Sequence, residues 1–505
     1  MKTILRFILA VTFIGFFSTR AAIYTVTSTF DAATANTNLL AGTLRKAIMD
    51  ANAHPGPDEI RFNLPGYNPV IVLASALPPI TQTVSIDAET PNPDGRITIN
   101  GDWFYPVAAA FDLQSGNSNV IRGLNLMATL VGIQIEANCN FNVIENNYIG
   151  TEHTGLRPPG NHRGEVGIAL SNSSSNLLRG NVIALQNQDG IQILGGSGNQ
   201  IMGNNIGTDR NGTAGFLSMA NGRHGIALDS SQRNSIGSID EPNIISGNGG
   251  IGIAIGVLNP GFSASSNIIA YNYIGVDSYQ RPLGNGSYGI EINQKRGNQI
   301  LNNWIGGNYA HGIYVLGSSA VSNSIAGNIL GQARPAGGWP PVSSPDSPAA
   351  GRMFQGNWGD GINIALGQYN QVADNTIYGN GGNGVQLDKA SFNRVELNFI
   401  EWNRLAGVFI QTFTSSFANA NRVGGNYITG HTYPGIVVTA TGVNATATGN
   451  DLSANNISGN RDRSATTQPI GIDLGGTNEP VVYSAGWAPT LTNITSRGDG
   501  INPND

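Results

Sequence analysis

Apolar and polar residues alternate in short runs along most of the chain, and asparagines stand at fixed places between the runs. Residues 298–307, NQILNNWIGG, show the pattern N-x-apolar-x-x-N-x-apolar. Its copies begin at Asn142, Asn176, Asn199, Asn267, Asn298, Asn323, Asn370, Asn393 and Asn421. Alternation with period two predicts strands with one buried face, and runs this short are not stable alone. The repetition therefore predicts a solenoid of short strands.

A second motif, G-[IV]-x-[ILV], marks the start of each coil. It begins at Gly132, Gly167, Gly190, Gly225, Gly252, Gly289, Gly312, Gly361, Gly384, Gly407, Gly435 and Gly471. Intervals of 23 residues recur, and the other intervals are longer, so the unit is about 23 residues with insertions. One unit holds three short strands. Stacked units would pair equivalent strands about 4.8 Å apart, which predicts a parallel β-helix with residues such as Ile300 pointing inward.

The asparagines are expected at the corners between strands, because asparagine is depleted within strands. Asparagine tolerates the left-handed backbone conformation of a sharp corner. Its side-chain amide can also hydrogen-bond to the asparagine of the next coil, which would form a ladder. We predict that Asn303, Asn328 and Asn398 occupy equivalent corners of this kind. In this interpretation the asparagines are structural and do not mark a polar active site.

With its asparagine pairs, G-I motifs and 23-residue unit, the chain resembles the secreted right-handed parallel β-helix repeat proteins, whose architecture is shared with pectate-lyase-like enzymes. The resemblance covers roughly residues 84–475. It implies an all-β, right-handed, single-stranded parallel β-helix, and the handedness comes from the resemblance alone. Lyases, hydrolases, epimerases and adhesins share this fold, so the resemblance does not select an activity.

The two ends of the chain differ from the repeats. The segment TLRKAIMDANA, from Thr43, has apolar residues on one helical face and predicts an amphipathic helix that caps the first coil. Residues 1–21 combine Lys2 and Arg6 with a mostly apolar stretch, which is typical of a secretory signal peptide. We predict four segments: 1–21 signal peptide, 22–110 N-terminal cap and first coils, 111–480 parallel β-helix, and 481–505 C-terminal strand and tail.

Charge is scarce in this sequence. Charged residues make up 11% of the chain and the net charge is −6. Because there is no basic run, nucleic acid is not an expected partner. The single cysteine, Cys139, excludes an intramolecular disulfide, and no segment after residue 21 is apolar enough to cross a membrane. We expect a secreted or cell-surface monomer without a cofactor. A weak calcium alternative stays open, with oxygen ligands from Asp499, Asn502, Asn504 and Asp505.

The insertions nearly all fall between the third strand of one coil and the next G-I motif, so their loops should line one edge of the stack. The loops would wall a groove beside the outer face of the first strands. The outward positions on that face are Gln134, Ala169, Gln192, Ala227, Ala254, Glu291, Tyr314, Asn363, Gln386, Phe409, Val437 and Asp473. Most are bland, and the exceptions cluster on the sixth and seventh coils, next to the longest insertion, Gly331 to Asp360.

That cluster supplies the candidate site. The catalytic candidates are Glu291, Arg296, His311 and Tyr314, and the substrate-binding candidates are Tyr288, Asn293, Lys295, Trp339 and Trp358. A base, a phenol and a guanidinium are what β-elimination on a uronate requires. Trp339 and Trp358 suit sugar stacking, whereas Trp304 and Trp402 are expected to fill corners. A second patch, Arg223, His224 and Asp229, lies two coils earlier. The alternative is a solvated strand face with turn-filling residues.

Two functions stay open. In the first, the chain is a secreted or cell-surface β-helix that binds polysaccharide or a cell-surface glycan, or forms a non-catalytic adhesive scaffold. In the second, it is a polysaccharide-processing enzyme: a uronate lyase, an epimerase or a glycoside hydrolase. The sequence has neither the Asp-Asp pair nor the G-H-G triplet of polygalacturonases, and no aspartate cluster like the pectate-lyase calcium site. These absences, with the bland outer face, favour the first function.

Overall fold

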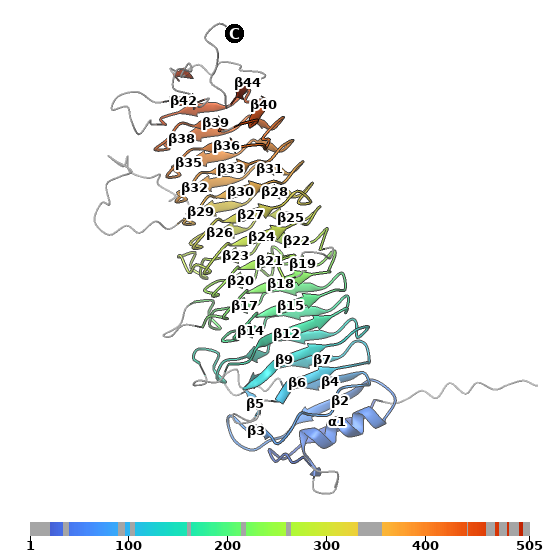
Figure 1. Ribbon diagram of the computed structural model, residues 1–505. Helices are drawn as coiled ribbons and strands as arrows, with labels where there is room; N and C mark the ends of the chain where they lie inside the picture. The colour runs from blue at the N-terminus through green and yellow to red at the C-terminus, as the bar shows by residue number, and fades with distance from the viewer. Residues whose placement is uncertain are drawn as a thin grey trace, which may run out of the picture.

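Each coil of the chain contributes one short strand to each of three sheets, and the coils stack along one long axis (Figure 1). The computed structural model describes residues 21–33, 40–88, 96–101, 107–158, 163–213, 219–258, 264–331, 356–441, 443–460, 470–473, 482–483 and 494–497. Residues 1–20 of the predicted signal peptide, Trp339 and the four residues of the calcium alternative lie outside these ranges. The prediction of an all-β parallel β-helix is confirmed.

Sheet A contains the first strand of the chain, and its neighbouring strands are all parallel. Its strands are β1 Ile23–Val26, β2 Asp58–Phe62, β4 Val84–Asp87, β7 Val120–Arg122, β10 Val143–Glu145, β13 Leu177–Arg179, β16 Gln200–Met202, β19 Ser235–Ile236, β22 Ile268–Ala270, β25 Gln299–Leu301, β28 Ser324–Ala326, β31 Gln371–Ala373, β34 Arg394–Glu396 and β37 Arg422–Gly424. Ile300 is completely buried and pairs with Ile269 and Ile325 of the neighbouring coils. The predicted inward column of isoleucines is therefore confirmed.

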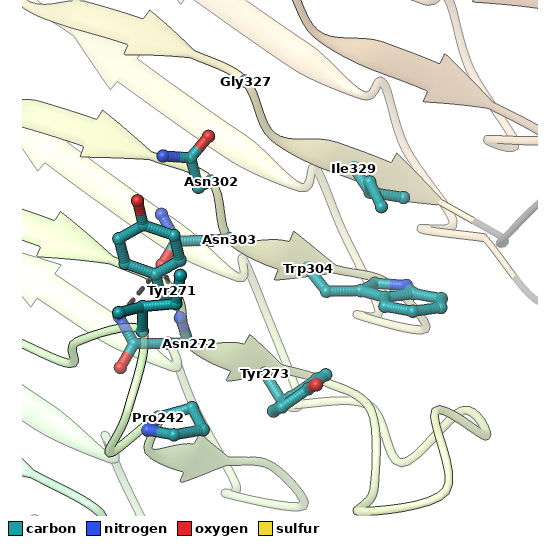
Figure 2. Close-up of a pocket in the computed structure, with 10 residues that line it drawn as sticks. Pro242, Tyr271, Asn272, Tyr273, Asn302, Asn303, Trp304, Gly327 and Ile329 are labelled. Carbon is teal, nitrogen blue, oxygen red and sulfur yellow. Dashed lines mark hydrogen bonds between the residues drawn. The ribbon is translucent and has the colours of Figure 1, made fainter.

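Sheet B carries aromatic side chains on its outer face. Its strands are β3 Val70–Leu73, β5 Ile97–Gly101, β8 Leu124–Met127, β11 Tyr148–Ile149, β14 Val182–Ile183, β17 Asn205–Ile206, β20 Ile244–Ile245, β23 Tyr273–Ile274, β26 Trp304–Ile305, β29 Ile329–Gly331, β32 Thr376–Tyr378, β35 Phe399–Glu401, β38 Tyr427–Thr429 and β41 Asn456–Ser458. Tyr273, Trp304 and Ile329 lie in register and line a cleft of about 250 Å³ (Figure 2). The expectation that Trp304 fills a corner was wrong, because it lies within β26, where strand alternation turns its ring outward.

Sheet C contains the G-I motifs. Its strands are β6 Val107–Leu113, β9 Thr129–Ile135, β12 Val166–Ser171, β15 Ile191–Leu194, β18 Ile226–Asp229, β21 Ile253–Ile255, β24 Ile290–Asn293, β27 Ile313–Leu316, β30 Ile362–Ala365, β33 Val385–Asp388, β36 Val408–Thr412, β39 Ile436–Ala440, β42 Ile470–Asp473 and β43 Val482–Tyr483. All neighbours are parallel except β42 and β43. A separate antiparallel pair, β40 Thr446–Asn450 and β44 Ile494–Arg497, lies at the C-terminal end.

The predicted helix closes the N-terminal end of the solenoid. Helix α1, Leu44–Ala53, packs against β1 and β2 and covers the first coil (Figure 1). The Thr43 side chain caps it by accepting a hydrogen bond from the main-chain N–H of Lys46, at 3.2 Å. The buried residues of this helix, Leu44, Arg45, Ala47, Ile48 and Ala51, include the whole predicted apolar face. No helix within the described residues is long and apolar enough to span a membrane.

The asparagines form hydrogen-bonded rows that run from coil to coil at the corners. In each row the side-chain amide of one asparagine donates to the side-chain oxygen of the next. The first row is Asn119, Asn142, Asn176, Asn199, Asn234, Asn267, Asn298, Asn323, Asn370, Asn393, Asn421 and Asn450, and the second is Asn147, Asn181, Asn204, Asn243, Asn272, Asn303, Asn328, Asn375, Asn398, Asn426 and Asn455. The predicted equivalence of Asn303, Asn328 and Asn398 is confirmed.

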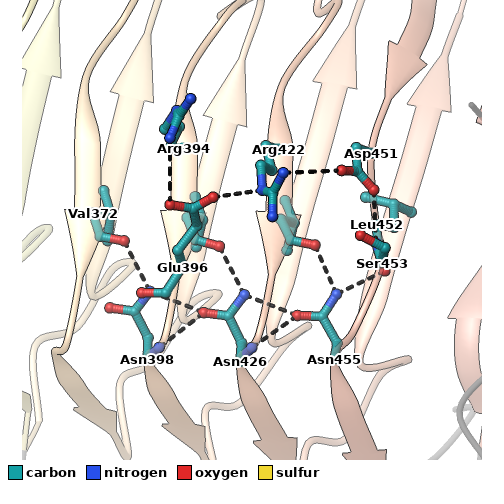
Figure 3. Close-up of polar contacts among 12 residues, drawn as sticks. Val372, Arg394, Glu396, Asn398, Arg422, Asn426, Asp451, Leu452, Ser453 and Asn455 are labelled. Atoms are coloured by element: carbon teal, nitrogen blue, oxygen red, sulfur yellow. Dashed lines mark hydrogen bonds and ion pairs between the residues drawn. The ribbon is translucent and has the colours of Figure 1, made fainter. Parts of the chain in front are cut away.

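Figure 3 shows three members of the second row, Asn398, Asn426 and Asn455, side by side below a chain of exposed ion pairs. Each amide also donates to a main-chain carbonyl, as Asn398 does to Val372 at 2.9 Å. The rows are completely or almost completely buried. Because a buried amide without partners is costly, this full set of hydrogen bonds explains why so many asparagines are tolerated inside the corners.

The corners themselves differ from the prediction in one respect. The left-handed residue is not the ladder asparagine but the residue before it: Asn302, at φ +55°, precedes Asn303, and Leu397, at φ +60°, precedes Asn398. The ladder asparagines are absent from the positive-φ residues of the described chain. The exposed residue adopts the left-handed conformation that makes the sharp turn. The asparagine that follows it points its side chain inward and forms the ladder hydrogen bonds.

A third row was not predicted. It comprises Asn221, Asn248, Asn285, Asn308, Asn357, Asn380 and Asn403. After Asn403 the next position is taken by His431, which is completely buried. The Nδ1 atom of His431 accepts a hydrogen bond from the main-chain N–H of Asn403 at 3.2 Å, and its Nε2 lies 3.0 Å from the carbonyl oxygen of Ile400. The imidazole therefore replaces an asparagine in the ladder.

Candidate functional site

The outer face of sheet C carries one row of residues in register, at the positions expected from the sequence. Parallel pairing joins Asp112, Gln134, Ala169, Gln192, Ala227, Ala254, Glu291, Tyr314, Asn363, Gln386, Phe409, Val437 and Asp473 in this order. Glu291 in β24 and Tyr314 in β27 are direct partners across neighbouring coils. The structure therefore brings these two predicted site residues together on one face.

Three aromatic rings pack together beside Glu291. The Tyr288 ring stacks on the His311 imidazole, with ring centroids 5.5 Å apart and an interplanar angle of 3°. The Tyr314 ring is tilted against both, with centroid distances of 4.8 Å to Tyr288 and 5.4 Å to His311. Tyr288 and His311 each precede the glycine that begins a G-I motif, so equivalent turns on successive coils stack them. We call Tyr288, His311 and Tyr314 the aromatic cluster.

The His311 imidazole is held in one tautomer. Its Nδ1 atom accepts a hydrogen bond from the main-chain N–H of Asp360 at 2.9 Å, so the neutral ring carries its proton on Nε2. The Oδ2 atom of Asp360 lies 3.2 Å from the same Nδ1, but a nitrogen that already accepts the amide proton cannot also donate. Burial lowers the pKa of His311, and the Asp360 carboxylate opposes this shift. The ring is therefore a neutral hydrogen-bond donor through Nε2.

The acidic groups of the cluster are also perturbed. Burial raises the pKa of Glu291, and a hydrogen bond from the Asn293 amide, at 3.3 Å, opposes this. Burial also raises the pKa values of Tyr288 and Tyr314, and the Glu291 carboxylate adds to both shifts. The two phenols therefore stay protonated near neutral pH and can donate hydrogen bonds. Contiguous ionisable groups with shifted pKa values on an accessible face are a frequent mark of a functional site.

An exposed aromatic pair borders the cluster at the corner between sheets B and C. The rings of Tyr309 and Trp358 stack with centroids 5.4 Å apart and an interplanar angle of 14°. They are 60% and 65% exposed, respectively. Each stands two residues before a member of the site, because Tyr309 precedes His311 and Trp358 precedes Asp360. Of the two predicted loop tryptophans, Trp358 thus lies beside the site, and Trp339 is outside the described residues.

Three other predicted residues take different places. Asn293 is half-buried and bonds to Glu291. Lys295 is only 3% exposed, and its side chain lies across Gly256 of the preceding coil, where a Cβ atom would collide with it. Arg296 follows the end of β24 and is exposed. The contact given for the Glu291 side chain is with the Asn293 amide, and the ring contacts of the aromatic cluster join only Tyr288, His311 and Tyr314.

The second predicted patch is closed by internal contacts. The guanidinium of Arg223 bonds to the buried Asp189 carboxylate at 2.5 Å. Nδ1 of His224 accepts the main-chain N–H of Ile251 at 3.1 Å, and burial lowers the pKa of this histidine. Asp229 is buried and accepts the main-chain N–H of Leu258. These internal contacts give Arg223, His224 and Asp229 a structural role.

Sequence reasoning missed three residues of the site. Tyr309 is not among the predicted site residues, Asp360 is named only as the end of the longest insertion, and Asn363 is counted among the bland outward positions. Asp360 and Asn363 belong to one network, because the Asn363 amide donates to Asp360 at 2.9 Å. The one available signal was the position before the G-I glycine, which His311 and Asp360 share. The described residues contain no group of three or more His, Cys, Asp or Glu side chains placed to hold a metal ion.

Comparison with known proteins supports the fold. A family model described as right-handed beta helix region matches residues 94–330 and 351–452. No curated protein matches the chain. Similar solved structures include the periplasmic alginate epimerase AlgG, with 13% identity, coverage of 69% of this chain and 76% of that one, and a TM-score of 0.40.

Two further structures extend the comparison. The A-module of the Azotobacter vinelandii mannuronan C-5 epimerase AlgE6 has 14% identity, coverage of 86% of this chain and 92% of that one, and a TM-score of 0.32. The Dettilon tailspike protein gp208 has 14% identity, coverage of 83% and 64%, and a TM-score of 0.37. Similarity at this level carries no argument about this chain, and the function must be argued from the site itself.

Proposed function

The chain belongs to the right-handed β-helix family, and we propose that it binds polysaccharide along the outer face of sheet C. The observation that carries this proposal is the aromatic cluster, in which half-buried rings pack beside Glu291 on an otherwise bland face. The stacked pair of Tyr309 and Trp358 adds an exposed apolar platform next to it.

The chemistry of this face suits a sugar chain. A pyranose ring has apolar C–H faces that pack on aromatic rings, and hydroxyl groups that need both donors and acceptors. The phenols of Tyr288 and Tyr314 and the Nε2–H group of His311 supply donors. Carboxylate and amide oxygens of Glu291 and Asn363 supply acceptors. The same proposal places the protein outside the cell or on its surface, where such polymers occur, and treats it as a monomer.

The first test is the substitution Trp358→Ala. We expect it to weaken glycan binding by about tenfold or more, because tryptophan is enriched among the residues that dominate binding energy and this exposed ring would be covered by the bound ligand. Binding is measured by isothermal titration calorimetry after a polysaccharide array has identified a ligand. The substitution removes exposed surface, so the melting temperature should change little.

The matched control is Phe392→Ala. Phe392 also belongs to an exposed stacked pair, with Tyr369 at 5.0 Å, but it lies at a corner preceding sheet A. It should not affect binding. If both substitutions weaken the glycan equally, or if Trp358→Ala has no effect, the ligand does not lie on the Tyr309–Trp358 platform.

A second candidate function is acid–base catalysis on the bound polymer, and the single tautomer of His311 favours it. In this proposal the Glu291 carboxylate removes the C5 proton of a uronate, a C4–C5 double bond forms as the C4–O bond breaks, and His311 Nε2–H or the Tyr314 hydroxyl protonates the leaving oxygen. Arg296 was predicted to neutralise a substrate carboxylate, but its exposed position beyond β24 does not support that role.

The catalytic candidate is tested with His311→Ala and Tyr314→Phe. If the protein is an enzyme, either substitution should lower turnover by about a hundredfold or more while the melting temperature stays close to that of the wild type. Product formation is followed by mass spectrometry of the polymer ligand. A wild-type protein that binds the polymer but releases no altered product would contradict catalysis and leave the binding function standing.

A further inference from the structure

The outer face of sheet C presents a group of carboxylates, Glu291, Asp360 and Asp388. The Glu291 carboxylate accepts a hydrogen bond from the Asn293 amide. The Asp360 carboxylate accepts hydrogen bonds from the Asn363 amide and the main-chain N–H of Asn383, and it lies 3.2 Å from Nδ1 of His311. Asp388, at the end of β33, is half-buried on the same face, and burial raises its pKa. The charge of Lys389 acts on Asp388 and opposes this pKa shift, whereas the contacts given above for Glu291 and Asp360 include no lysine or arginine. This part of the face is therefore acidic.

The nearby cations are held elsewhere. The Lys295 side chain lies over Gly256, and its charge interacts with Asp229. Lys389 follows Asp388 and lies over the Phe413 ring, with Nζ 5.2 Å from the ring centroid. The neutral state of His311 removes another source of positive charge. An anionic polymer would therefore meet the Glu291 and Asp360 carboxylates, whose contacts described above include no lysine or arginine.

The same face offers acceptor atoms that lack donors. Asn363 is 7% exposed, its amide donates to Asp360, and its Oδ1 atom has no hydrogen-bond partner. Asn363 pairs with Tyr314 on the outer row, so this oxygen belongs to the face of the aromatic cluster. The Oδ1 atom of Asp388 is also buried without a partner. A buried acceptor without a donor is costly, and sugar hydroxyl groups are suitable donors.

We propose that this face takes a neutral glycan and discriminates against polyuronates. Hydroxyl groups of the neutral chain donate to Asn363, Asp388 and Glu291, while its ring faces pack on the aromatic cluster. A uronate replaces a hydroxymethyl group by a carboxylate, which only accepts hydrogen bonds and repels the acidic residues at close range. This inference rests on the proposed polysaccharide-binding function and names the class of its ligand.

The test compares polymers that share a backbone and differ in charge. The pairs are β-1,4-mannan and polymannuronate, and β-1,4-glucan and glucuronan, offered as soluble oligosaccharides to the full chain. For at least one pair, the neutral member should bind about tenfold more tightly or better at low ionic strength, because like charges at close range repel by about 1 kcal/mol or more. Added salt should narrow the difference by screening it.

A double variant, Glu291→Gln with Asp388→Asn, probes the cause. For the backbone whose neutral polymer binds the wild type, this variant should raise the affinity for the corresponding uronate polymer by about tenfold. The matched control, Asp240→Asn with Asp374→Asn, changes the net charge equally at exposed positions away from sheet C and should leave the ratio unchanged. Melting temperatures of both variants exclude misfolding.

The outcomes separate the two proposals. If polyuronates bind as tightly as their neutral partners or more tightly, and Trp358→Ala weakens that binding, the polysaccharide function stands and the neutral-glycan inference is wrong. If the control variant changes the ratio of neutral to uronate affinity as much as the Glu291→Gln, Asp388→Asn variant does, the discrimination comes from overall charge. The neutral-glycan inference is then also wrong. If no polymer of either kind binds, both proposals fail together.

Discussion

Asn303→Ala is expected to lower the free energy of unfolding by roughly 3–6 kcal/mol, because it breaks a buried ladder at its middle. The Asn303 oxygen accepts the main-chain and side-chain amides of Asn272, both at 2.9 Å. Its amide donates to the carbonyl of Ile269 at 2.8 Å and to Asn328 at 3.0 Å. Alanine removes all four hydrogen bonds and leaves the buried main-chain N–H of Asn272 without this partner, which alone costs about 1–3 kcal/mol, and each of the other lost bonds adds about 0.5–1.5 kcal/mol.

The matched control is Asn302→Gly, one residue earlier. Asn302 is exposed and has φ +55°, a conformation that glycine adopts without strain. It should change stability by less than about 1 kcal/mol. Chemical unfolding and amide hydrogen exchange measure both variants, and exchange should rise first in the coils next to β26, since each coil contacts only its neighbours. Equal effects at positions 302 and 303 would mean that the ladder is not the stabilising element.

His431→Asn is expected to remove an acid sensitivity of the solenoid. Burial lowers the pKa of His431 to about 4, against an ordinary value of 6.5. Between these two values the unfolded chain binds a proton that the folded chain does not, so stability falls as the pH drops. The full difference corresponds to roughly 3 kcal/mol, present above pH 6.5 and lost as the pH approaches 4.

Asparagine at this position would continue the third row from Asn403 to Asn460 with a group that does not titrate. Wild type and variant are compared by chemical unfolding at pH 7.5 and pH 4.5. The wild type should lose roughly 2–3 kcal/mol more than the variant between the two values. His153→Asn, at a histidine in a turn outside the asparagine rows, is the control for general acid effects. An identical pH profile for wild type and His431→Asn would show that His431 does not carry the acid sensitivity.

The solenoid explains how a few candidate functional residues that are far apart in the sequence come close together in the structure. The coils stay in register whatever the length of the loop between them. An inserted loop can therefore project from the corner between sheets B and C without disturbing the stack. His311 and Asp360 are 49 residues apart in sequence, yet the amide of one bonds to the ring of the other. The aromatic cluster is thus built by stacking equivalent positions, not by a local motif.

Much of the fold was predictable because the structure of each coil is determined by residues that lie close together in the sequence. The alternation around Ile300, the spacing of the asparagine pairs and the amphipathic helix from Leu44 each concern residues close in sequence. The candidate site was predictable in part. Glu291 and Tyr314 were assigned to neighbouring outward positions, and their pairing is confirmed. The turn conformation was assigned to the wrong residue, because which of two adjacent asparagines folds inward depends on the ladder above and below it.

The sequence by itself thus determined the parallel coil, its inward and outward faces and the row on which Glu291 and Tyr314 lie. Only the tertiary structure decided that Lys295 lies across Gly256, that Asp360 faces His311 and that Asn363 has an acceptor without a donor. The physical reason is that strand alternation fixes the direction of a side chain within its own coil, whereas partners, burial and charge state depend on the side chains of the coils above and below. Those contacts arise only when the coils are stacked.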